Sequence, residues 1–170
     1  MTDSAQRELK KISLPRTLTW AVVLITVDAF VFNQGIISAL VGIWMLFISL
    51  PRAVFSKIPE QRHLRLARVV IFLVAVFIVI GLNRLNNQIA KNRAETLITA
   101  VKSFKQQYHR YPVKLDELVP EFIDHIPRAK YTLMLSDFRY TPPCCLYYVA
   151  LPPFGRPTYN FESDKWGYID

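Results

Sequence analysis

The fold of this chain is decided by residues 66–112, LARVVIFLVAVFIVIGLNRLNNQIAKNRAETLITAVKSFKQQYHRYP. The first part, Leu66 to Leu82, is almost entirely apolar, as a helix in lipid requires. The second part is amphipathic, because apolar residues recur at helical spacing with charged residues between them. Tyr111-Pro112 ends the pattern, since proline disfavours helix in the residue before it. We therefore expect a helix that begins in a membrane and continues into a domain outside it.

A second apolar stretch, residues 18–50, precedes this helix. It is too long for one comfortable span and just long enough for two short ones, because a span needs about 20 residues. Asn33-Gln34-Gly35 is the polar, flexible interruption near its middle. We predict a helical hairpin with spans at about 15–32 and 36–54, followed by a third span at about 66–83.

The charge distribution supports this topology. The net charge is +8 over 170 residues, and the excess lies in residues 1–16 and 51–68, which flank the predicted spans. A hairpin places both basic stretches in the cytoplasm, in agreement with the positive-inside rule. The sequence thus predicts a membrane domain over residues 1–83 with a cytoplasmic N-terminus, and an extracytoplasmic domain over residues 84–170. Charge placed in this way does not indicate nucleic-acid binding.

Small and acidic residues inside the first two spans are candidates for helix packing. Gly35, Ser38, Ala39 and Gly42 form two small-x-x-x-small pairs, which let helices approach closely in lipid. These pairs pack either within the chain or against a partner subunit. Asp28 is the one acid inside a predicted span. It either reaches the membrane interface, contacts another helix, or takes part in ion or proton movement.

After Pro112 the sequence predicts a short helical turn at residues 115–118 and then a small antiparallel sheet. A sheet of this size needs a cover for its apolar face, and the amphipathic helix is the available cover. The expected fold class is therefore α+β. Pro142-Pro143, Pro152-Pro153 and the Gly155 turn separate the β-rich pieces. The predicted strands are Tyr131–Leu135, Phe138–Thr141, Leu146–Leu151 and Pro157–Phe161.

Residues 94–127 read AETLITAVKSFKQQYHRYPVKLDELVPEFIDHIP. This string resembles the helix end and following loop of type IV pilins and type II secretion pseudopilins, where a Tyr-Pro pair precedes a Leu-x-x-Leu-Val-Pro segment. Residues 138–140, the 147–151 segment and Trp166 fall where such domains have strands and a terminal aromatic residue. The resemblance covers half the chain. It implies a long helix lying on an antiparallel sheet, and a role in assembly or protein contact rather than catalysis.

The chain departs from that family in two respects. The cleavable prepilin leader motif is absent, and two extra predicted spans precede the helix. A secretory signal peptide is also not indicated, because no small-x-small site follows the first apolar segment at a useful distance. A pilin subunit must leave the membrane to stack in a filament. We therefore expect a fixed protein of the bacterial inner membrane that carries a periplasmic pilin-like domain.

Motifs for catalysis and cofactor binding are not found. The sequence has no Gly-x-Ser-x-Gly, no Gly-x-x-x-x-Gly-Lys and no His-Glu-x-x-His. We expect no enzymatic activity, no cofactor and no small-molecule substrate. His109 and His125 flank the Tyr-Pro loop and are either a metal pair or separate surface residues. Cys144 and Cys145 are adjacent, so they form either a vicinal disulfide or two free thiols.

Calcium is a further alternative at the C-terminal end. Some pseudopilins bind calcium in loops of this region, where the present chain has Glu162, Asp164 and Asp170. These acids lack a defined loop spacing. They form either a calcium site or a solvated acidic tail.

Aromatic residues of the predicted sheet are either core residues or a docking patch for protein. Tyr140, Tyr147, Tyr148 and Trp166 are the candidate contacts. Two functions remain open. The first is a non-catalytic binding or accessory component of a pilus or secretion apparatus, with membrane or periplasmic proteins as partners. The second is a membrane immunity protein against a periplasmic or pore-forming toxin, which small size and several spans fit equally well.

Overall fold

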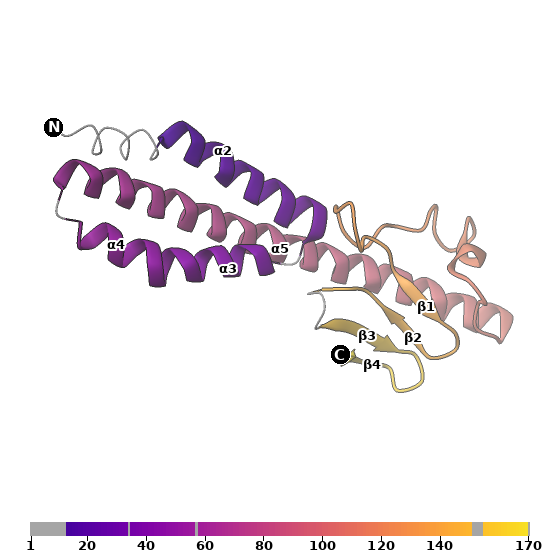
Figure 1. The fold of residues 1–170 in the computed structure, drawn as a ribbon. Coiled ribbons are helices and arrows are strands. Elements are labelled where there is room, and N and C mark those ends of the chain that lie inside the picture. Colours follow the sequence, from indigo (N-terminus) through magenta and orange to yellow (C-terminus); the bar gives the residue numbers. More distant parts are fainter. Residues whose placement is uncertain (1–12, 34, 57, 151–154, 170) are drawn as a thin grey trace. The chain divides into compact units, whose positions relative to one another are not determined.

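The structure, a computed structural model, describes residues 13–33, 35–56, 58–150 and 155–169. The predictions for the basic residues within 1–12, for Gln34, Lys57 and Pro152-Pro153, and for Asp170 lie outside these residues. The chain divides into two compact units, Met1–Asn83 and Arg84–Asp170. The elements in chain order (Figure 1) are α2 Leu14–Ile25, η1 Thr26–Phe32, α3 Ile36–Trp44, η2 Met45–Ser49, α4 Leu50–Val54, α5 Pro59–Tyr108, η3 Leu115–Leu118, β1 Arg139–Thr141, β2 Cys145–Tyr147, β3 Arg156–Asn160 and β4 Lys165–Ile169.

Three helical stretches are long and apolar enough to cross a membrane: Leu14–Phe32, Ile36–Val54 and Gln61–Tyr108. The prediction of three such helices is confirmed. In the first two stretches, α-helix passes into π-helical turns, η1 and η2. The turn between them contains Asn33 and Gly35, both with left-handed backbone conformations at φ 50° and φ 70°. The left-handed conformation of these two residues lets the chain change direction between η1 and α3.

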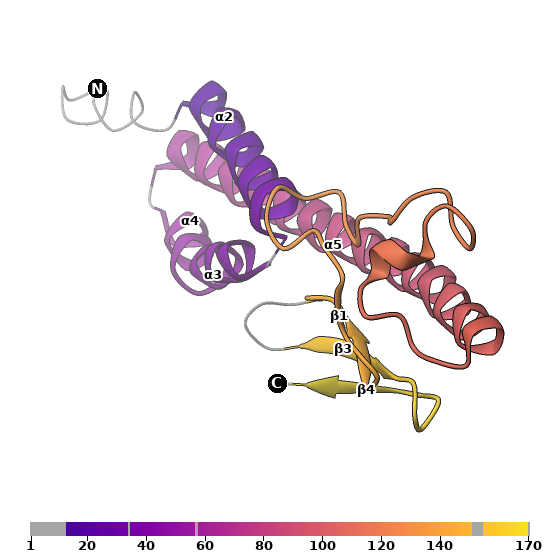
Figure 2. The same cartoon turned by 90° about the vertical axis from the view of Figure 1, so that its right-hand side faces the viewer.

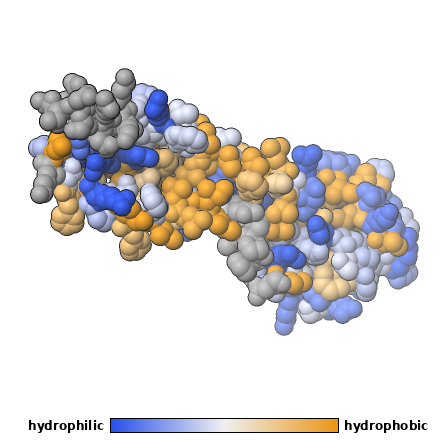
Figure 3. Space-filling view, in the orientation of Figure 1, coloured by the Kyte–Doolittle hydropathy of each residue, from blue (hydrophilic) through white to orange (hydrophobic). Residues whose placement is uncertain are grey.

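The first unit has a small apolar core and exposes many other large apolar residues. Its core joins α2, η2 and α5 through Ala21, Leu24, Met45, Phe72 and Ala75. Large apolar side chains point outward instead, among them Trp20 (64% exposed), Phe47 (74%) and Phe77 (71%). Figure 3 shows this apolar surface in orange over the helices of the first unit. An exposed apolar surface of this extent is typical of helices that lipid covers.

The second unit has an ordinary core between α5 and the sheet. The part of α5 after residue 83 buries Ala94, Leu97, Val101 and Phe104 against Leu146 and other sheet residues. Figure 2 shows the strands lying beside this part of α5. The amphipathic pattern of the sequence predicts the middle of the buried face, although Leu85 and Tyr108 at its ends are exposed. Helix α5 ends at Tyr108, shortly before the Tyr-Pro pair.

The sheet is a meander with strand order β1-β2-β3-β4, and every pair is antiparallel. In this register Leu146 lies opposite Tyr159, and Tyr159 lies opposite Trp166. Directly opposed residues share a face of a sheet. The side chains of Leu146 and Tyr159 belong to the core of the unit, so this row defines the face that packs on α5. The predicted α+β class with a small antiparallel sheet is confirmed.

One predicted strand is wrong, and one observed strand was not predicted. Residues 131–135 form a loop, because the N–H groups of Ala129 and Lys130 both donate to the carbonyl of Ser136, at 2.6 and 3.2 Å, and close the segment on itself. The fourth strand is β4, a segment that the sequence indicated only as a terminal aromatic beside acidic residues. Its alternation of Lys165, Trp166 and Gly167 is a weak strand signal, and its pairing with β3 stabilises it.

Candidate functional site

Asp28 joins the two helices of the hairpin. Its side chain is completely buried, and its two carboxylate oxygens accept hydrogen bonds from the N–H groups of Gly35 and Ser38, each at 2.8 Å. These donors lie at the start of α3, where backbone N–H groups have no partner within the helix. A carboxylate is favourable there because the helix dipole places partial positive charge at the N-terminus. Of the three roles considered for Asp28, the structure shows a contact with another helix.

The small residues of α3 do not all face the same way. A Cβ atom added to Gly42 would lie 3.7 Å from Cγ1 of Val76, so α3 packs on α5 at this point. Ser38, one turn earlier, is completely buried. Ala39 is exposed, so the Gly35–Ala39 pair does not form the same packing face. Gly35 belongs to the turn, where its φ of +70° disfavours any other residue.

The four aromatic candidates for protein contact divide into buried and accessible residues. Tyr148 is only 4% exposed and lies in the core, which removes it from a docking surface. Tyr140 packs against the core, and its hydroxyl donates to the carbonyl of Pro112 at 3.1 Å. Tyr147 is half-buried. Trp166 is 37% exposed and is the most accessible of the four candidates.

Strand β4 is an open edge of the sheet. Within the residues that the structure describes, it pairs only with β3, and all five of its residues are exposed. Tyr168 is 76% exposed and Ile169 is 48% exposed. Sequence reasoning did not identify these two residues, because their importance depends on β4 being a strand at an edge. An alternating Trp-x-Tyr pattern was the available signal.

Trp166 is held in place from the core side of β4. Its ring lies at centroid distances of 5.5 Å from Tyr159 and 6.5 Å from Tyr148, in edge-to-face arrangements. Because these partners are buried, the indole is positioned before any partner binds. A shallow groove of about 240 Å³ follows the same strand and is lined by Thr158, Asn160 and residues 165–169 among others. The edge therefore combines a fixed aromatic side chain with a groove.

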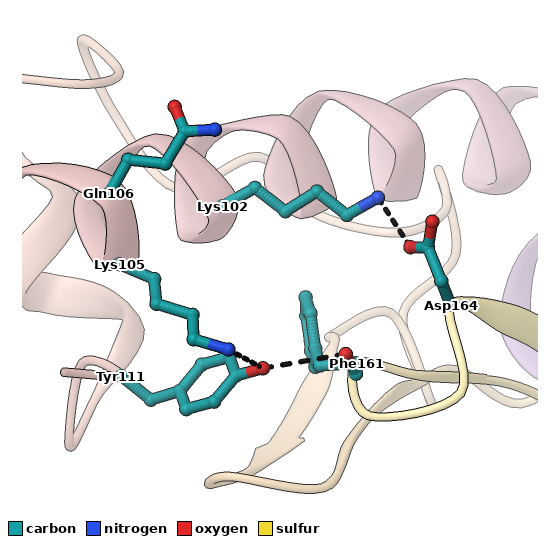
Figure 4. A pocket seen from close by; sticks show the side chains of 6 residues that line it. All are labelled: Lys102, Lys105, Gln106, Tyr111, Phe161 and Asp164. Atoms are coloured by element: carbon teal, nitrogen blue, oxygen red, sulfur yellow. Dashed lines mark hydrogen bonds and ion pairs between the residues drawn. The ribbon is translucent and has the colours of Figure 1, made fainter. Parts of the chain in front are cut away.

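A polar pocket of about 420 Å³ lies between α5 and the turn from β3 to β4 (Figure 4). Lys102 forms an ion pair with Asp164 at 2.5 Å, and Lys105 donates to the hydroxyl of Tyr111 at 2.9 Å. The Tyr111 hydroxyl in turn donates to the carbonyl of Phe161 at 3.4 Å. These contacts tie α5 to the Tyr-Pro loop and to the turn before β4. They fix the turn from which the open edge begins.

Hydrogen bonding also determines the charge state of this pocket. The bond to Asp164 raises the pKa of Lys102, with a smaller contribution from Tyr159. The bond from Lys102 lowers the pKa of Asp164. Burial raises the pKa of Tyr159, whose hydroxyl also donates to Asp164. At neutral pH the lysine and the aspartate are therefore both charged, and Tyr159 is neutral.

The candidate metal ligands are the two histidines beside the Tyr-Pro loop and the acids near the C-terminal end. Among the described residues, no group of three His, Cys, Asp or Glu side chains is placed to hold a metal ion. His109 and His125 are both exposed. The carboxylate of Asp164 is engaged by Lys102 and Tyr159. Cys144 and Cys145 form a vicinal disulfide, one of the two alternatives for this pair.

Comparison with protein-family models, with curated proteins and with solved structures finds no match. The geometry described above therefore carries the functional argument.

Proposed function

We propose that this chain is a bacterial inner-membrane protein whose second unit binds other proteins outside the cytoplasm. In this proposal it is a non-catalytic accessory component of a pilus or secretion apparatus. The observation that carries it is the open edge strand β4, with Trp166, Tyr168 and Ile169 exposed along it. The resemblance of the Tyr-Pro region to pilins and pseudopilins suggests the class of partner.

An edge strand can bind protein in a way that an internal strand cannot. Its outer N–H and C=O groups are available to pair with an extended segment of a partner, and side chains on both faces provide specificity. Trp166 is an aromatic side chain already fixed by Tyr159 and Tyr148. Fixed aromatic side chains contribute strongly to binding, because little conformational entropy is lost when the partner docks.

The first unit supplies the anchor in this proposal. Its outward Trp20, Phe47 and Phe77 match lipid, and the arginines of α4 and the start of α5 mark one end. There Arg65 donates to the carbonyl of Arg52 and to the side chain of Gln61. We place this arginine-rich end in the cytoplasm, because basic residues beside spans are retained there.

The orientation is tested with reporter enzymes that are active only in the periplasm. A fusion after residue 90 should be active, and a fusion near residue 58 should be inactive. The reverse pattern would contradict the proposed orientation. A fusion after Asn33-Gln34-Gly35 adds a control, because the hairpin places this turn on the same side as residue 90.

The binding role is tested by photo-crosslinking in cells. A photoreactive amino acid at position 168 should form adducts with a component of a pilus or secretion apparatus, identified by mass spectrometry. The matched control is position 113, because Val113 is also exposed (64%) but lies outside the edge strand. Equal adducts at both positions, or none at position 168, would contradict the proposal. An adduct with a toxin would instead support the immunity function.

A substitution completes this test. Tyr168→Ala with Ile169→Ser should reduce recovery of the partner, since each removes apolar contact area from the edge. Surface substitutions of this kind usually change stability by less than about 0.5 kcal/mol. An unchanged thermal transition in mild detergent then separates lost binding from lost folding.

A further inference from the structure

The segment between η3 and β1 contains a loop with an unusual surface. We define residues 130–136 as the tip loop. Its exposed apolar side chains are Tyr131 (62% exposed), Leu133 (81%), Met134 (51%) and Leu135 (42%). A row of exposed apolar residues in a short loop is costly in water, which indicates that another surface covers it.

The tip loop has a fixed conformation at its base. The N–H groups of Ala129 and Lys130 share the carbonyl of Ser136, and the hydroxyl of Thr132 donates to the carbonyl of Met134 at 2.9 Å. Lys130 is only 2% exposed, and its ammonium donates to the carbonyl of Ala150 at 3.0 Å. The apolar tip therefore projects from a base that is held by internal contacts.

Arg93 attaches this loop to α5. Its guanidinium donates to the carbonyl of Arg128 at 2.8 Å and lies over the ring of Tyr131, 4.3 Å from the centroid. Arg93 follows Asn83, the end of the predicted span, by ten residues of unbroken helix. At about 1.5 Å per residue this corresponds to roughly 15 Å along the helix axis.

The loop is long enough to cover most of that distance. Three residues from its base to its tip span at most roughly 10 Å. Figure 1 shows the segment that leads into β1, in orange, lying beside the part of α5 that belongs to the second unit. The headgroup layer on each side of a bilayer is roughly 5–7 Å thick. A loop of this length that extends towards the span can therefore reach the lipid headgroups.

Charges near the loop complement an anionic surface. Between Asn83 and Ala94, α5 carries Arg84, Lys91 and Arg93 and no acidic residue. Arg84, Lys91 and Arg128 are exposed. The segment 128–136 also contains no acid. Cations around an apolar tip match the surface of a bilayer that contains anionic phospholipids.

We propose that the tip loop docks on the membrane surface, with Leu133 and Met134 at the boundary of headgroups and acyl chains and the neighbouring cations against anionic headgroups. This docking rests on the crossing of the membrane by α5. It does not depend on the protein-binding role of β4, so either proposal can fail alone.

The test measures the depth of the loop in the full-length protein, reconstituted in nanodiscs. A nitroxide is attached to a cysteine at position 133 (Leu133→Cys) in a Cys144→Ser, Cys145→Ser background. Its exposure to oxygen, which partitions into lipid, is compared with its exposure to an aqueous nickel chelate. Discs with one quarter phosphatidylglycerol are compared with pure phosphatidylcholine. The matched control is Val113→Cys, because Val113 is also apolar and exposed (64%) but lies beyond the far end of α5.

We expect the label at position 133 to be shielded from the nickel chelate and accessible to oxygen, and the label at position 113 to show the opposite. Arg128→Gln should reduce the ratio of docked to undocked loop about fivefold in anionic discs and leave it unchanged in neutral ones. Leu133→Ser, read from a label at Met134→Cys, should reduce the ratio about tenfold in both.

Two results would overturn the proposal. The first is equal nickel accessibility at positions 133 and 113 in both compositions. The second is a label at position 133 that is shielded from both reagents, which would mean that protein covers the loop. Near-UV circular dichroism of every labelled protein confirms folding, and the label at position 134 repeats the measurement if the Leu133→Cys protein does not fold.

Discussion

The two parts of helix α5 differ in the side chains that face outward. Before Asn83, the helix buries Phe72 and Ala75 and exposes other apolar residues such as Phe77. After Asn83, it buries Leu97 and Phe104 and exposes charged residues such as Lys102. The comparison shows that helical secondary structure alone does not indicate the solvent around a helix. The polarity of the outward-facing side chains does.

The largest expected effect on stability comes from comparing a large-to-small substitution in each of the two parts of α5. Leu97→Ala removes a completely buried side chain from the core of the second unit and should lower its free energy of unfolding by about 3–4 kcal/mol. Phe77→Ala removes a side chain that is 71% exposed and should change stability by less than about 0.5 kcal/mol in detergent. Urea titrations in mild detergent, followed by fluorescence, measure both. Similar losses for the two variants would remove the contrast.

The next effect tests the turn of the hairpin. Asp28→Ala leaves the N–H groups of Gly35 and Ser38 without their acceptors and should cost about 2–3 kcal/mol, because both bonds are to a charged group. Asp28→Asn retains one acceptor oxygen and should lose less. Thermal inactivation in detergent, followed by size-exclusion chromatography, ranks the three proteins. Equal transitions for all three would show that the cap does not stabilise the hairpin.

Two glycines of the first unit differ in their surroundings: Gly42 lies on a packed helix face and Gly81 on an open one. Gly42→Leu forces a side chain against Val76 and should destabilise the first unit by about 1–3 kcal/mol. Gly81→Leu is the matched control, because no atom lies within 4 Å of a Cβ added there. The same thermal assay applies. A greater loss for Gly81→Leu would contradict the packing of α3 on α5.

The smallest expected effect is a dependence of the stability of the second unit on pH. Burial lowers the pKa of Lys130 to about 8 from its ordinary 10.5. The unfolded chain therefore binds more protons between pH 8 and 10.5, and stability rises with pH in this window. Lys130→Met removes the buried charge and should stabilise the unit at pH 7 by about 1–2 kcal/mol. The two proteins should converge only above the unfolded pKa of Lys130, by about pH 11, in urea titrations at several pH values.

At still higher pH, the ionisation of two buried tyrosines should lower the stability of the second unit. Burial raises the pKa of both Tyr140 and Tyr148 to about 12 from 10. The folded unit then retains protons that the unfolded chain releases, so stability should fall as pH rises from 10 to 12. A gap between Lys130→Met and the parent protein that is as large at about pH 11 as at pH 7 would show that the ammonium of Lys130 does not titrate as its burial requires.

The structural features that depend on local sequence, such as helix position and helix ends, could be predicted from the sequence. The three apolar helices follow from composition and length, and the end of α5 follows from periodicity and the Tyr-Pro pair. Asp28 was a clear candidate because an acid in an apolar helix needs a partner. The partners themselves, two N–H groups after the turn, depend on how the turn closes, which residue types do not encode.

Features set by distant contacts could not be predicted in the same way. Residues 131–135 have the composition of a strand, but hydrogen bonds to Ser136 close them into a loop. Strand β4 has a weak local signal and owes its form to pairing with β3. Whether Tyr148 or Tyr168 faces water depends on the register of the sheet, and a shift of one residue would reverse the answer.

The meander order of the sheet has a consequence for how the chain acquires its structure during synthesis. Each strand pairs with the one made just before it, so no strand must enter between two others already in place. The part of α5 that carries Leu97 and Phe104 precedes all four strands in the chain and offers its apolar face first. A chain that emerges gradually can therefore add β1 through β4 one after another, and the aromatic contacts of Trp166 close the unit last.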